Sequence, residues 1–469
     1  MDIKIGSMNI LFNPKSVAVI GASEKEAKLG FHVMKSLTKG GFPGKITPIN
    51  PGSKEIMGLK AFPSITELPY DIDLAIVVLP AKMVPAIFKE CLAKGVKGIV
   101  LITAGFKEID DPVGSDLHDQ LAKIVNRPNV PVIGPNTCGM INLHANLNAS
   151  FTPEFSLLKK GSIGLASQSG GMCHLISFMA MRDDIGFSKI VGIGNRLNVD
   201  FAEMVDYLMH DPDTYVIALY IEGIDNPKEL IDTAKTYKGK KPIIAYKTGI
   251  GDIGNQASRS HTGSMAGRGE IYSGAFSQAG IMGMDSMEDL LDTAKALAGS
   301  PVPNGSGVAI LSSQAGPGIA AADICQTGGL NIVSFTPETQ NKINEILPPL
   351  ALRTNPVDMG PAWYNSEAIL GILQAVMQDE KVAGILLSMM FASANVDSIK
   401  SLSFLLNYRE QKKPIITCLS APPGIWDEQI KQFEEAKSLV NFPTPERAAK
   451  VMVNLNRYQS LIKAKSPPC

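Results

Sequence analysis

A long polar loop with a single histidine is the segment of this 469-residue chain best suited to covalent chemistry. Residues 248–267, TGIGDIGNQASRSHTGSMAG, show no apolar periodicity, and long loops of this kind inside compact domains are commonly functional. His261 lies near the tip of the loop among small hydroxylic and glycine neighbours, where a bulky group has room to approach. An imidazole in such a position serves as a nucleophile or as a general base.

Glu222 is the candidate partner of this histidine. It follows the apolar run that precedes the loop, in the sequence YIEG. A carboxylate there would accept a hydrogen bond from one ring nitrogen of His261 and leave the other nitrogen free to attack. By composition alone, Glu222 is equally well an exposed carboxylate at the end of a strand.

The segment SQSGG offers a candidate anion site. Ser169, Gly170 and Gly171 stand where an apolar run leads into a helical pattern over 172–181. Backbone amides at a helix N-terminus, together with a serine hydroxyl, favour a bound phosphate. The alternative is an ordinary N-cap, since serine is a preferred cap residue. His174, one turn into this helix, is more typical of a structural side chain.

The first apolar run ends in a second candidate ligand loop, IGASEKEAKLG, which contains Gly21, Ala22 and Ser23. Its spacing departs from GxGxxG, and no acidic residue follows the second run, where an NAD-binding protein places one. That run leads instead to Pro51 and Lys54, and a lysine there would pair with a phosphate. A plain tight turn with a solvated lysine accounts for the pattern equally well.

Two more strand ends belong to the same predicted edge, at Pro80 and Thr103, and GPNTCG at 134–139 adds a turn there. The carboxyl ends of parallel strands form the ligand crevice of an open α/β sheet. We therefore expect one crevice lined by these turns. Cys138, within the last of them, has no recognisable histidine partner and is predicted to be a small buried residue.

Short apolar runs at regular intervals predict the elements that position these residues. In the first third they lie at 17–20, 46–50, 74–80, 98–103 and 130–134. Later runs lie at 162–167, 189–194, 216–223, 242–247, 307–313, 329–333, 382–390 and 414–419. Helical patterns separate them, including 83–94 and a C-terminal stretch at 445–463, and 301–306 is typical of a linker. The sequence thus predicts an α/β protein with three successive doubly wound parallel sheets.

Composition and charge exclude several classes of protein. Lys plus Arg total 44 and Asp plus Glu total 45, so a general nucleic-acid or membrane-surface binder is disfavoured. The six cysteines are scattered without a CxxC pair, which predicts reduced thiols, no metal site and a cytoplasmic location. No leader pattern and no run of about 18 apolar residues is found, so secretion and membrane spanning are not expected.

The motifs together resemble the NDP-forming acyl-CoA synthetases, relatives of succinyl-CoA synthetase, and above all the α subunits of ADP-forming acetate–CoA ligases. The similarity covers nearly the whole chain, and SHTGSMAG is its most specific motif. The other matching blocks are VIGAS, GFPGKITPINP, AIVVLPA, GPNTCGMIN, SQSGG, GNRLNVD, YIEGI, AFSQAGIM, AGPG and NPVDM.

The resemblance implies a fold and a set of roles. It implies a Rossmann-like CoA-binding domain at 1–145, a flavodoxin-like ligase domain with the phosphohistidine loop at 146–300, and a second flavodoxin-like domain at 301–469. His261 resembles the phosphohistidine and Glu222 the carboxylate that orients it. The implied phosphate-binding residues are Ser169, Gly170 and Gly171. The implied CoA-binding residues are Gly21, Ala22, Ser23, Pro51, Lys54, Pro80 and Thr103.

In this family, acyl-CoA and phosphate give an acyl phosphate and CoA, the phosphoryl group moves to histidine, and phosphohistidine phosphorylates ADP. The sequence contains no GxxxxGK[ST] loop and nothing that resembles the ATP-grasp domain. The resemblance therefore implies an ATP-grasp β subunit that holds Mg²⁺ with ADP or ATP, in an α₂β₂ heterotetramer. Departures from the pattern occur at Asn198, Gln314 and Ala315, and Arg268 has no assigned role.

Two alternatives come from other classes. One is a CoA-responsive regulatory or scaffold protein without turnover, which would have no need of the SHTGS tip or of Glu222. The other is an NAD-dependent dehydrogenase, which shares the fold class but would place an acidic residue after the second apolar run.

Overall fold

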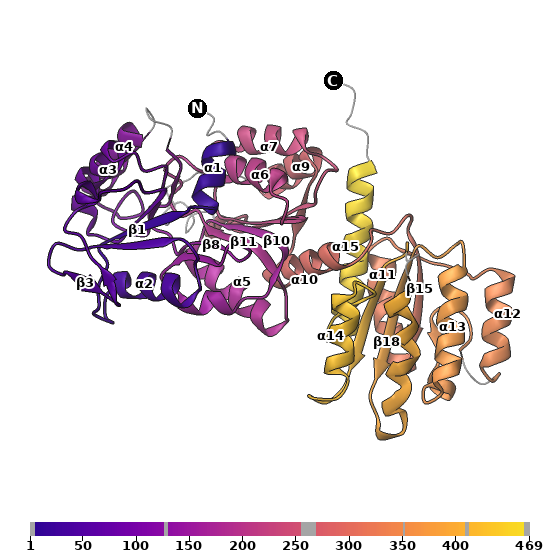
Figure 1. The fold of residues 1–469 in the computed structure, drawn as a ribbon. Helices are drawn as coiled ribbons and strands as arrows, with labels where there is room; N and C mark the ends of the chain where they lie inside the picture. Colours follow the sequence, from indigo (N-terminus) through magenta and orange to yellow (C-terminus); the bar gives the residue numbers. More distant parts are fainter. Residues whose placement is uncertain (1–4, 126–129, 255–268, 350–351, 409–411, 464–469) are drawn as a thin grey trace. The chain divides into compact units, whose positions relative to one another are not determined.

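Three main sheets organise the chain in this computed structural model, which describes residues 5–125, 130–254, 269–349, 352–408 and 412–463 (Figure 1). The chain divides into two compact units, residues 1–287 and 288–469. The first unit contains two of the main sheets, and the second unit contains the third. The predicted α/β fold with three successive sheets is therefore confirmed. Among the described helices, none has both the length and the apolar character needed to cross a membrane.

The first sheet is entirely parallel, with the strand order β2-β1-β5-β6-β7. Its strands are β1 (Ser16–Ile20), β2 (Lys45–Ile49), β5 (Leu74–Val77), β6 (Gly98–Leu101) and β7 (Val132–Ile133). The accompanying helices are α2 (Leu29–Lys39), α3 (Val84–Ala93) and α4 (Pro112–Val125). Strands β1, β5 and β6 are apolar and almost wholly buried, as in parallel sheets covered on both faces. The five apolar runs of the first third are thus confirmed as strands.

The second sheet mixes parallel and antiparallel strands in the order β14-β13-β12-β10-β11-β8-β9. Its strands are β8 (Gly139–Asn142), β9 (Leu147–Ser150), β10 (Lys160–Ser167), β11 (Phe187–Gly192), β12 (Val216–Ile221), β13 (Ile243–Lys247) and β14 (Ile281–Met284). The helices are α5 (Gly170–Arg182), α6 (Phe201–His210), α7 (Pro227–Thr236) and α9 (Gly269–Ala279). The antiparallel hairpin β8–β9 was not predicted, and it brings residues from Gly139 onward into this sheet. The domain boundary predicted at 145 remains a prediction.

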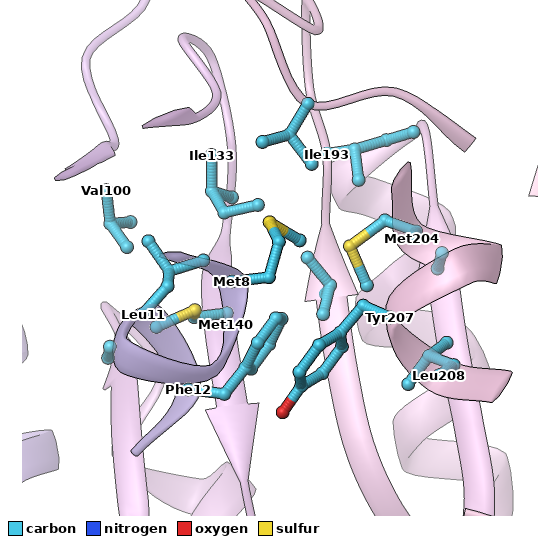
Figure 2. Close-up of a cluster of buried hydrophobic side chains, with 14 of the residues drawn as sticks. Met8, Leu11, Phe12, Val100, Ile133, Met140, Ile193, Met204, Tyr207 and Leu208 are labelled. Carbon is cyan, nitrogen blue, oxygen red and sulfur yellow. The ribbon is translucent and has the colours of Figure 1, made fainter. Parts of the chain in front are cut away.

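One hydrophobic cluster joins the first two sheets, and the short helix α1 (Ile5–Phe12) lies inside it (Figure 2). Met8, Leu11 and Phe12 are each at most 1% exposed. The ring of Phe12 stacks on Tyr207 of α6, with a centroid distance of 4.5 Å and an interplanar angle of 13°. Because apolar burial stabilises by roughly 25 cal/mol per Å², this shared core stabilises the packing of the two sheets against α1.

Asn198 adds a polar link between the same two sheets. Its side-chain amide donates to the Val130 carbonyl at 2.9 Å, and its side-chain oxygen accepts from the Val132 amide at 2.9 Å. The residue therefore pairs with two backbone groups at the open edge of the first sheet, one in β7 and one just before it. The departure from the family pattern at this position has a structural role, because a carboxylate could accept the one bond but not donate the other.

We expect Asn198→Ala to lower the free energy of unfolding by about 1–3 kcal/mol, because the Val130 carbonyl and the Val132 amide lose their partner. Asn198→Asp should give an intermediate loss, since it keeps only the acceptor. Chemical denaturation of the three proteins measures the effect. Equal stability of all three would show that water replaces the Asn198 side chain without cost.

The second unit holds a parallel sheet in the order β16-β15-β18-β19-β20, with β17 also paired to β15. Its strands are β15 (Gly307–Ser312), β16 (Asn331–Ile332), β17 (Val357–Asp358), β18 (Gly384–Met390), β19 (Ile415–Ser420) and β20 (Val440–Asn441). The helices are α10 (Met287–Gly299), α11 (Ala315–Thr327), α12 (Pro337–Ile346), α13 (Ser366–Gln378), α14 (Asp427–Glu435) and α15 (Pro445–Lys463). Arg447 of α15 binds Asp292 of α10 at 2.6 Å, so α10 is fixed to this unit. The predicted boundary at 300 remains a prediction.

Candidate functional site

A cleft of about 620 Å³ opens at the carboxyl edge of the first sheet. It is lined by the turns that follow β1, β2, β5 and β6. Six of the seven residues predicted to bind CoA line this cleft: Gly21, Ala22, Ser23, Pro51, Pro80 and Thr103. The turns are tied to one another, since the Asn50 side chain donates to the Ala22 carbonyl at 2.8 Å and Thr103 donates to the Leu79 carbonyl at 2.7 Å.

Two glycines give the cleft its shape. Gly21 has a φ of +95°, a conformation that side chains disfavour. A Cβ atom on Gly30 would overlap the Gly21 carbonyl oxygen, so only glycine lets the first turn of α2 lie against the loop after β1. The start of a helix is thereby held at the cleft, where its free backbone amides favour an anionic ligand.

Two charged residues line the cleft, Lys28 and Glu90, and the predicted Lys54 is not one of them. Lys28 is the exposed N-cap residue of α2, and its side chain makes no capping hydrogen bond. Lys54 is exposed and lies outside the cleft lining, so its predicted contact with a CoA phosphate stays a prediction. Lys28 was not singled out from the sequence, because its neighbours Lys25, Glu24 and Glu26 give it the appearance of one more solvated charge.

If CoA binds in this cleft, we expect Lys28→Ala to weaken CoA binding by roughly threefold to tenfold. The expected effect is small because an exposed lysine is hydrated, so its charge-assisted hydrogen bond to a phosphate contributes little net binding free energy. Calorimetric titration with CoA and with dephospho-CoA identifies the phosphate involved. Lys25→Ala, an exposed lysine of the same loop outside the lining, is the control, and Lys54→Ala tests the other candidate. A loss in Lys54→Ala alone would place the CoA phosphates beyond the cleft.

The predicted phosphate loop lies at the carboxyl end of β10 and begins α5. Ser169 is the N-cap of α5, and its hydroxyl accepts a hydrogen bond from the Met172 amide at 3.4 Å. The Ser167 hydroxyl donates to the Ser169 carbonyl at 2.9 Å and holds the turn. Gly171 is exposed, and a Cβ atom on Gly170 would meet no atom closer than 3.8 Å. The first amides of a 13-residue helix therefore face an open position that suits an anion.

Gln168 brings this loop and Glu222 together. It is 5% exposed, and its side-chain oxygen accepts from the Glu222 amide at 2.9 Å and from the Gly223 amide at 3.0 Å. Its own backbone amide donates to the Tyr220 carbonyl at 3.1 Å. The carboxylate of Glu222 is half-buried and accepts a hydrogen bond from the Tyr220 hydroxyl at 3.5 Å. One buried amide side chain thus connects the backbone at Glu222 with the residue before Ser169 in the predicted phosphate loop.

Lys247 is a second residue of this edge that was not singled out from the sequence. It ends β13 and is 9% exposed, and its ammonium donates to the Glu222 carbonyl oxygen at 2.8 Å and to the carbonyl of Thr248. Burial lowers the pKa of Lys247 to about 8, against the opposing effect of the Glu222 charge. A buried strand that ends in lysine was the available signal, because unpaired lysines are rarely buried.

A third set of contacts links the cleft to Glu222 through the loop after β11. The carboxylate of Glu108 accepts from the Gly105 amide at 2.5 Å and also from the Asn195 side chain. Arg196, the next residue, donates to the Gly223 carbonyl at 2.9 Å. These contacts run from a turn beside Thr103 to the residue after Glu222, so the two predicted sites belong to one connected framework.

Two sequence features have structural explanations. Both ring nitrogens of His174 are engaged, with the Thr152 hydroxyl at 2.7 Å and the Gly170 carbonyl at 2.8 Å, as expected of a structural histidine. Cys138 is 1% exposed, and its hydrogen bond to Cys173, together with burial, raises the pKa of the Cys173 thiol. Thiols in this setting are poor nucleophiles.

His261 lies outside the described residues, as does Arg268. The segments that lead to and from this loop are described, and they are β13 with residues 248–254 and helix α9. The end of β13 lies next to the end of β12, which precedes Glu222, since the two strands are parallel neighbours with Ile221 opposite Lys247. Tyr272 of α9 contacts the same edge, with its ring centre 4.8 Å from the Lys247 ammonium. The roles predicted for the site residues remain predictions. In the described part of the chain, His, Cys, Asp and Glu form no group of three that could hold a metal ion.

Comparison with known families gives two matches. Residues 15–143 match a CoA-binding domain, and residues 160–297 match the flavodoxin-like domain of succinyl-CoA ligases. The first match covers the cleft, and the second covers the loop at Ser169, Glu222 and the segment with His261.

Comparison with curated proteins gives relatives over almost the full length. The chain is 36% identical to an acetate–CoA ligase [ADP-forming] II subunit alpha of Pyrococcus furiosus, over 94% of this chain and 96% of that protein. It is 33% identical to the corresponding type I subunit alpha of the same organism, over 96% and 98%. It is also 37% identical to an acetate–CoA ligase [ADP-forming] of Methanocaldococcus jannaschii, but spans only 63% of that longer protein.

The fold is shared with a solved structure of a dinucleotide-forming acetyl-coenzyme A synthetase 1 from Ca. Korarchaeum cryptofilum, in complex with phosphate and ADP. The TM-score is 0.89 at 31% identity, with 97% of each chain covered. A protein from Pyrococcus horikoshii OT3 matches with a TM-score of 0.86 at 33% identity, over 97% of this chain and all of that chain. The chain therefore belongs to the family of NDP-forming acyl-CoA synthetases, in the group of the α subunits of ADP-forming acetate–CoA ligases and their longer relatives.

Proposed function

We propose that this chain is the α subunit of an ADP-forming acyl-CoA synthetase. It interconverts acyl-CoA, ADP and phosphate with a carboxylic acid, CoA and ATP, by way of an acyl phosphate and a phosphohistidine at His261. The observation that supports the proposal is the hydrogen bond from the backbone amide of Glu222 to the side chain of Gln168, the residue just before the N-cap of α5. A helix N-terminus next to a carboxylate that orients an imidazole suits a histidine that receives a phosphoryl group.

The residues divide the reaction between two places. The cleft at Gly21, Pro80 and Thr103 holds CoA, so that an oxygen of phosphate attacks the thioester carbon and the CoA thiolate leaves. The amides of Gly170 and Gly171 with Ser169 stabilise the phosphoryl oxygens. A nitrogen of His261 then attacks the phosphorus of the acyl phosphate, and the carboxylate of the product acid leaves. Transfer of this phosphoryl group from the histidine nitrogen to ADP gives ATP and regenerates the imidazole.

We further propose acetate as the acid, with an ATP-grasp β subunit as the partner in an α₂β₂ heterotetramer. That partner would hold Mg²⁺ with the nucleotide. The longer relative from M. jannaschii supports a partner, because about a third of its length has no counterpart here. The acyl group differs among the relatives, since one of 33% identity is named 4-hydroxybutyrate–CoA ligase and one of 29% identity trans-feruloyl-CoA synthase. A cytoplasmic location belongs to the same proposal.

Phosphate-dependent release of CoA tests the proposal. The chain is mixed with acetyl-CoA, 4-hydroxybutyryl-CoA or feruloyl-CoA, with and without inorganic phosphate, and free thiol is measured. We expect release that requires phosphate and is fastest with acetyl-CoA. Fastest release with another thioester would change the acid but not the reaction type. Binding of CoA without any release, alone or with an ATP-grasp partner, would favour a regulatory or scaffold protein, and binding of NAD in place of CoA would favour a dehydrogenase.

A further inference from the structure

We infer that Lys247 is a positioning residue for Glu222, which it holds together with Thr248 and Tyr272. The inference rests on the proposed function and deepens it. It is carried by the contacts that one buried ammonium group makes with three different elements.

The contacts of Lys247 converge from β12, β13 and α9. Its Nζ donates to the carbonyl oxygen of Glu222 at 2.8 Å and to the carbonyl of Thr248. It also lies 4.8 Å from the centre of the Tyr272 ring, a distance suited to a cation–π interaction. Thr248 follows β13 and Tyr272 belongs to α9, so the ammonium connects both flanks of residues 249–268 with the residue proposed to orient the histidine.

The apolar surroundings of Lys247 explain why its ammonium makes these contacts. Alternation along β13 places Ile243, Ala245 and Lys247 on one face of the sheet, and the first two belong to the same apolar cluster as Tyr272. An ammonium in this position loses its hydration and must be satisfied by carbonyl oxygens and the ring. Burial accordingly lowers the pKa of Lys247 to about 8.

Among the described residues, titratable groups face this ammonium from the end of β12 and from α9. Glu222 at the end of β12 is the charged group whose field acts on it, and Tyr272 faces it from α9. The Tyr220 hydroxyl of β12 lies 3.2 Å from the Thr248 hydroxyl, and burial raises the pKa of Tyr220 to about 12. The other neighbouring strand, β14, has the sequence IMGM and carries no titratable side chain.

The strand β13 also provides a matched control. Lys241, just before its amino end, likewise donates to two backbone carbonyls, those of Leu208 at 2.9 Å and Asp211 at 2.7 Å. Burial lowers the pKa of Lys241 as well. The two lysines therefore share a chemical setting and differ in position, since only Lys247 is at the carboxyl edge beside Glu222.

The test compares Lys247→Met, Lys247→Arg, Lys241→Met and Lys241→Arg with the unaltered chain. Each protein is mixed with acetyl phosphate, and the rate of formation of acid-labile protein phosphate is measured from pH 6 to about 9.5, with CoA affinity measured separately. For Lys247→Met we expect the maximal rate to fall by about 10-fold to 100-fold, because a small displacement of a reacting pair has effects of this size. The concentration of acetyl phosphate at half-maximal rate and the affinity for CoA should stay unchanged.

The pH profile distinguishes positioning from general stability. In the unaltered chain the rate should fall as pH rises through about 8, because Lys247 then loses its proton and its charge-assisted bonds weaken. Arginine stays charged over this range, so Lys247→Arg should keep much of the rate and lose this alkaline decline. Both Lys241 variants should keep the rate and the profile of the unaltered chain.

Two results would overturn the inference. One is a Lys247→Met protein whose phosphorylation rate equals that of Lys241→Met. The other is a Lys247→Arg protein whose rate still falls at alkaline pH as in the unaltered chain. The second result can be measured even if Lys247→Met does not fold. An unaltered chain that forms no phosphohistidine would instead contradict the proposed function, so the two failures are distinguishable.

Discussion

Replacing His261 by alanine is expected to abolish acid-labile phosphorylation of the protein and phosphate-dependent formation of ATP. A methyl group offers no nucleophilic nitrogen, so the phosphoryl group of the acyl phosphate has no acceptor on the chain. Release of CoA from acetyl-CoA and phosphate should persist in this variant, because that step precedes transfer to histidine. Phosphate on the protein, free CoA and ATP, each measured in the presence of the partner subunit, check the three statements.

A control histidine separates the loss of a nucleophile from a general loss of structure. His210 ends α6 and is exposed, and its ring lies 2.8 Å from the Asp206 backbone carbonyl of its own helix and against the edge of Tyr237. His210→Ala should therefore leave all three activities within about twofold, as is usual for exposed substitutions. Normal ATP formation by His261→Ala would contradict the proposed mechanism.

Replacing Glu222 by glutamine is expected to slow histidine phosphorylation by roughly 100-fold to 1000-fold, a range typical of an essential proton-transfer or orienting partner. Glutamine keeps the size of the side chain and leaves the backbone bonds to Gln168 and Lys247 in place. It removes the negative charge that would orient an imidazole and stabilise its positive form. Initial rates of phosphorylation by acetyl phosphate, together with CoA affinity, measure the effect.

Asp225→Asn is the matched control for this variant. Asp225 is an exposed carboxylate three residues further along, 3.1 Å from Arg196 and 3.6 Å from Lys107. It should affect phosphorylation by less than about threefold, because asparagine keeps an oxygen that can accept a hydrogen bond from Arg196, and Arg196 keeps its bond to the Gly223 carbonyl. An equal loss of phosphorylation and CoA affinity in Glu222→Gln would assign Glu222 a structural role instead.

The sequence sufficed for the parts of the fold that depend on local patterns. Buried parallel strands are continuous apolar runs, so runs such as 216–223 and 307–313 coincide with β12 and β15. The hairpin β8–β9 was not predicted from the sequence, because its strands, GMIN and LNAS, are short and contain polar residues that are nevertheless buried. Their burial comes from contacts with β11 and α2, which no local pattern records.

The site was predictable to the extent that it follows from strand ends. Parallel strands bring their carboxyl ends to one edge, so the turns at Gly21, Pro80 and Thr103 were expected to meet and do line one cleft. Gln168, Lys247 and Lys28 were missed because their importance depends on partners distant in sequence. Gln168 lies between two serines that are themselves good caps, and only its bonds to residues 222 and 223 reveal its function.

The most direct test of the central claim is to treat the chain alone with acetyl phosphate and to locate the phosphate by mass spectrometry under conditions that preserve phosphohistidine. The account predicts an acid-labile phosphate on His261, absent from His261→Ala and formed slowly in Glu222→Gln. A phosphate on a different residue, or turnover of acetyl-CoA and phosphate to ATP in the assembled enzyme with His261 never labelled, would contradict it.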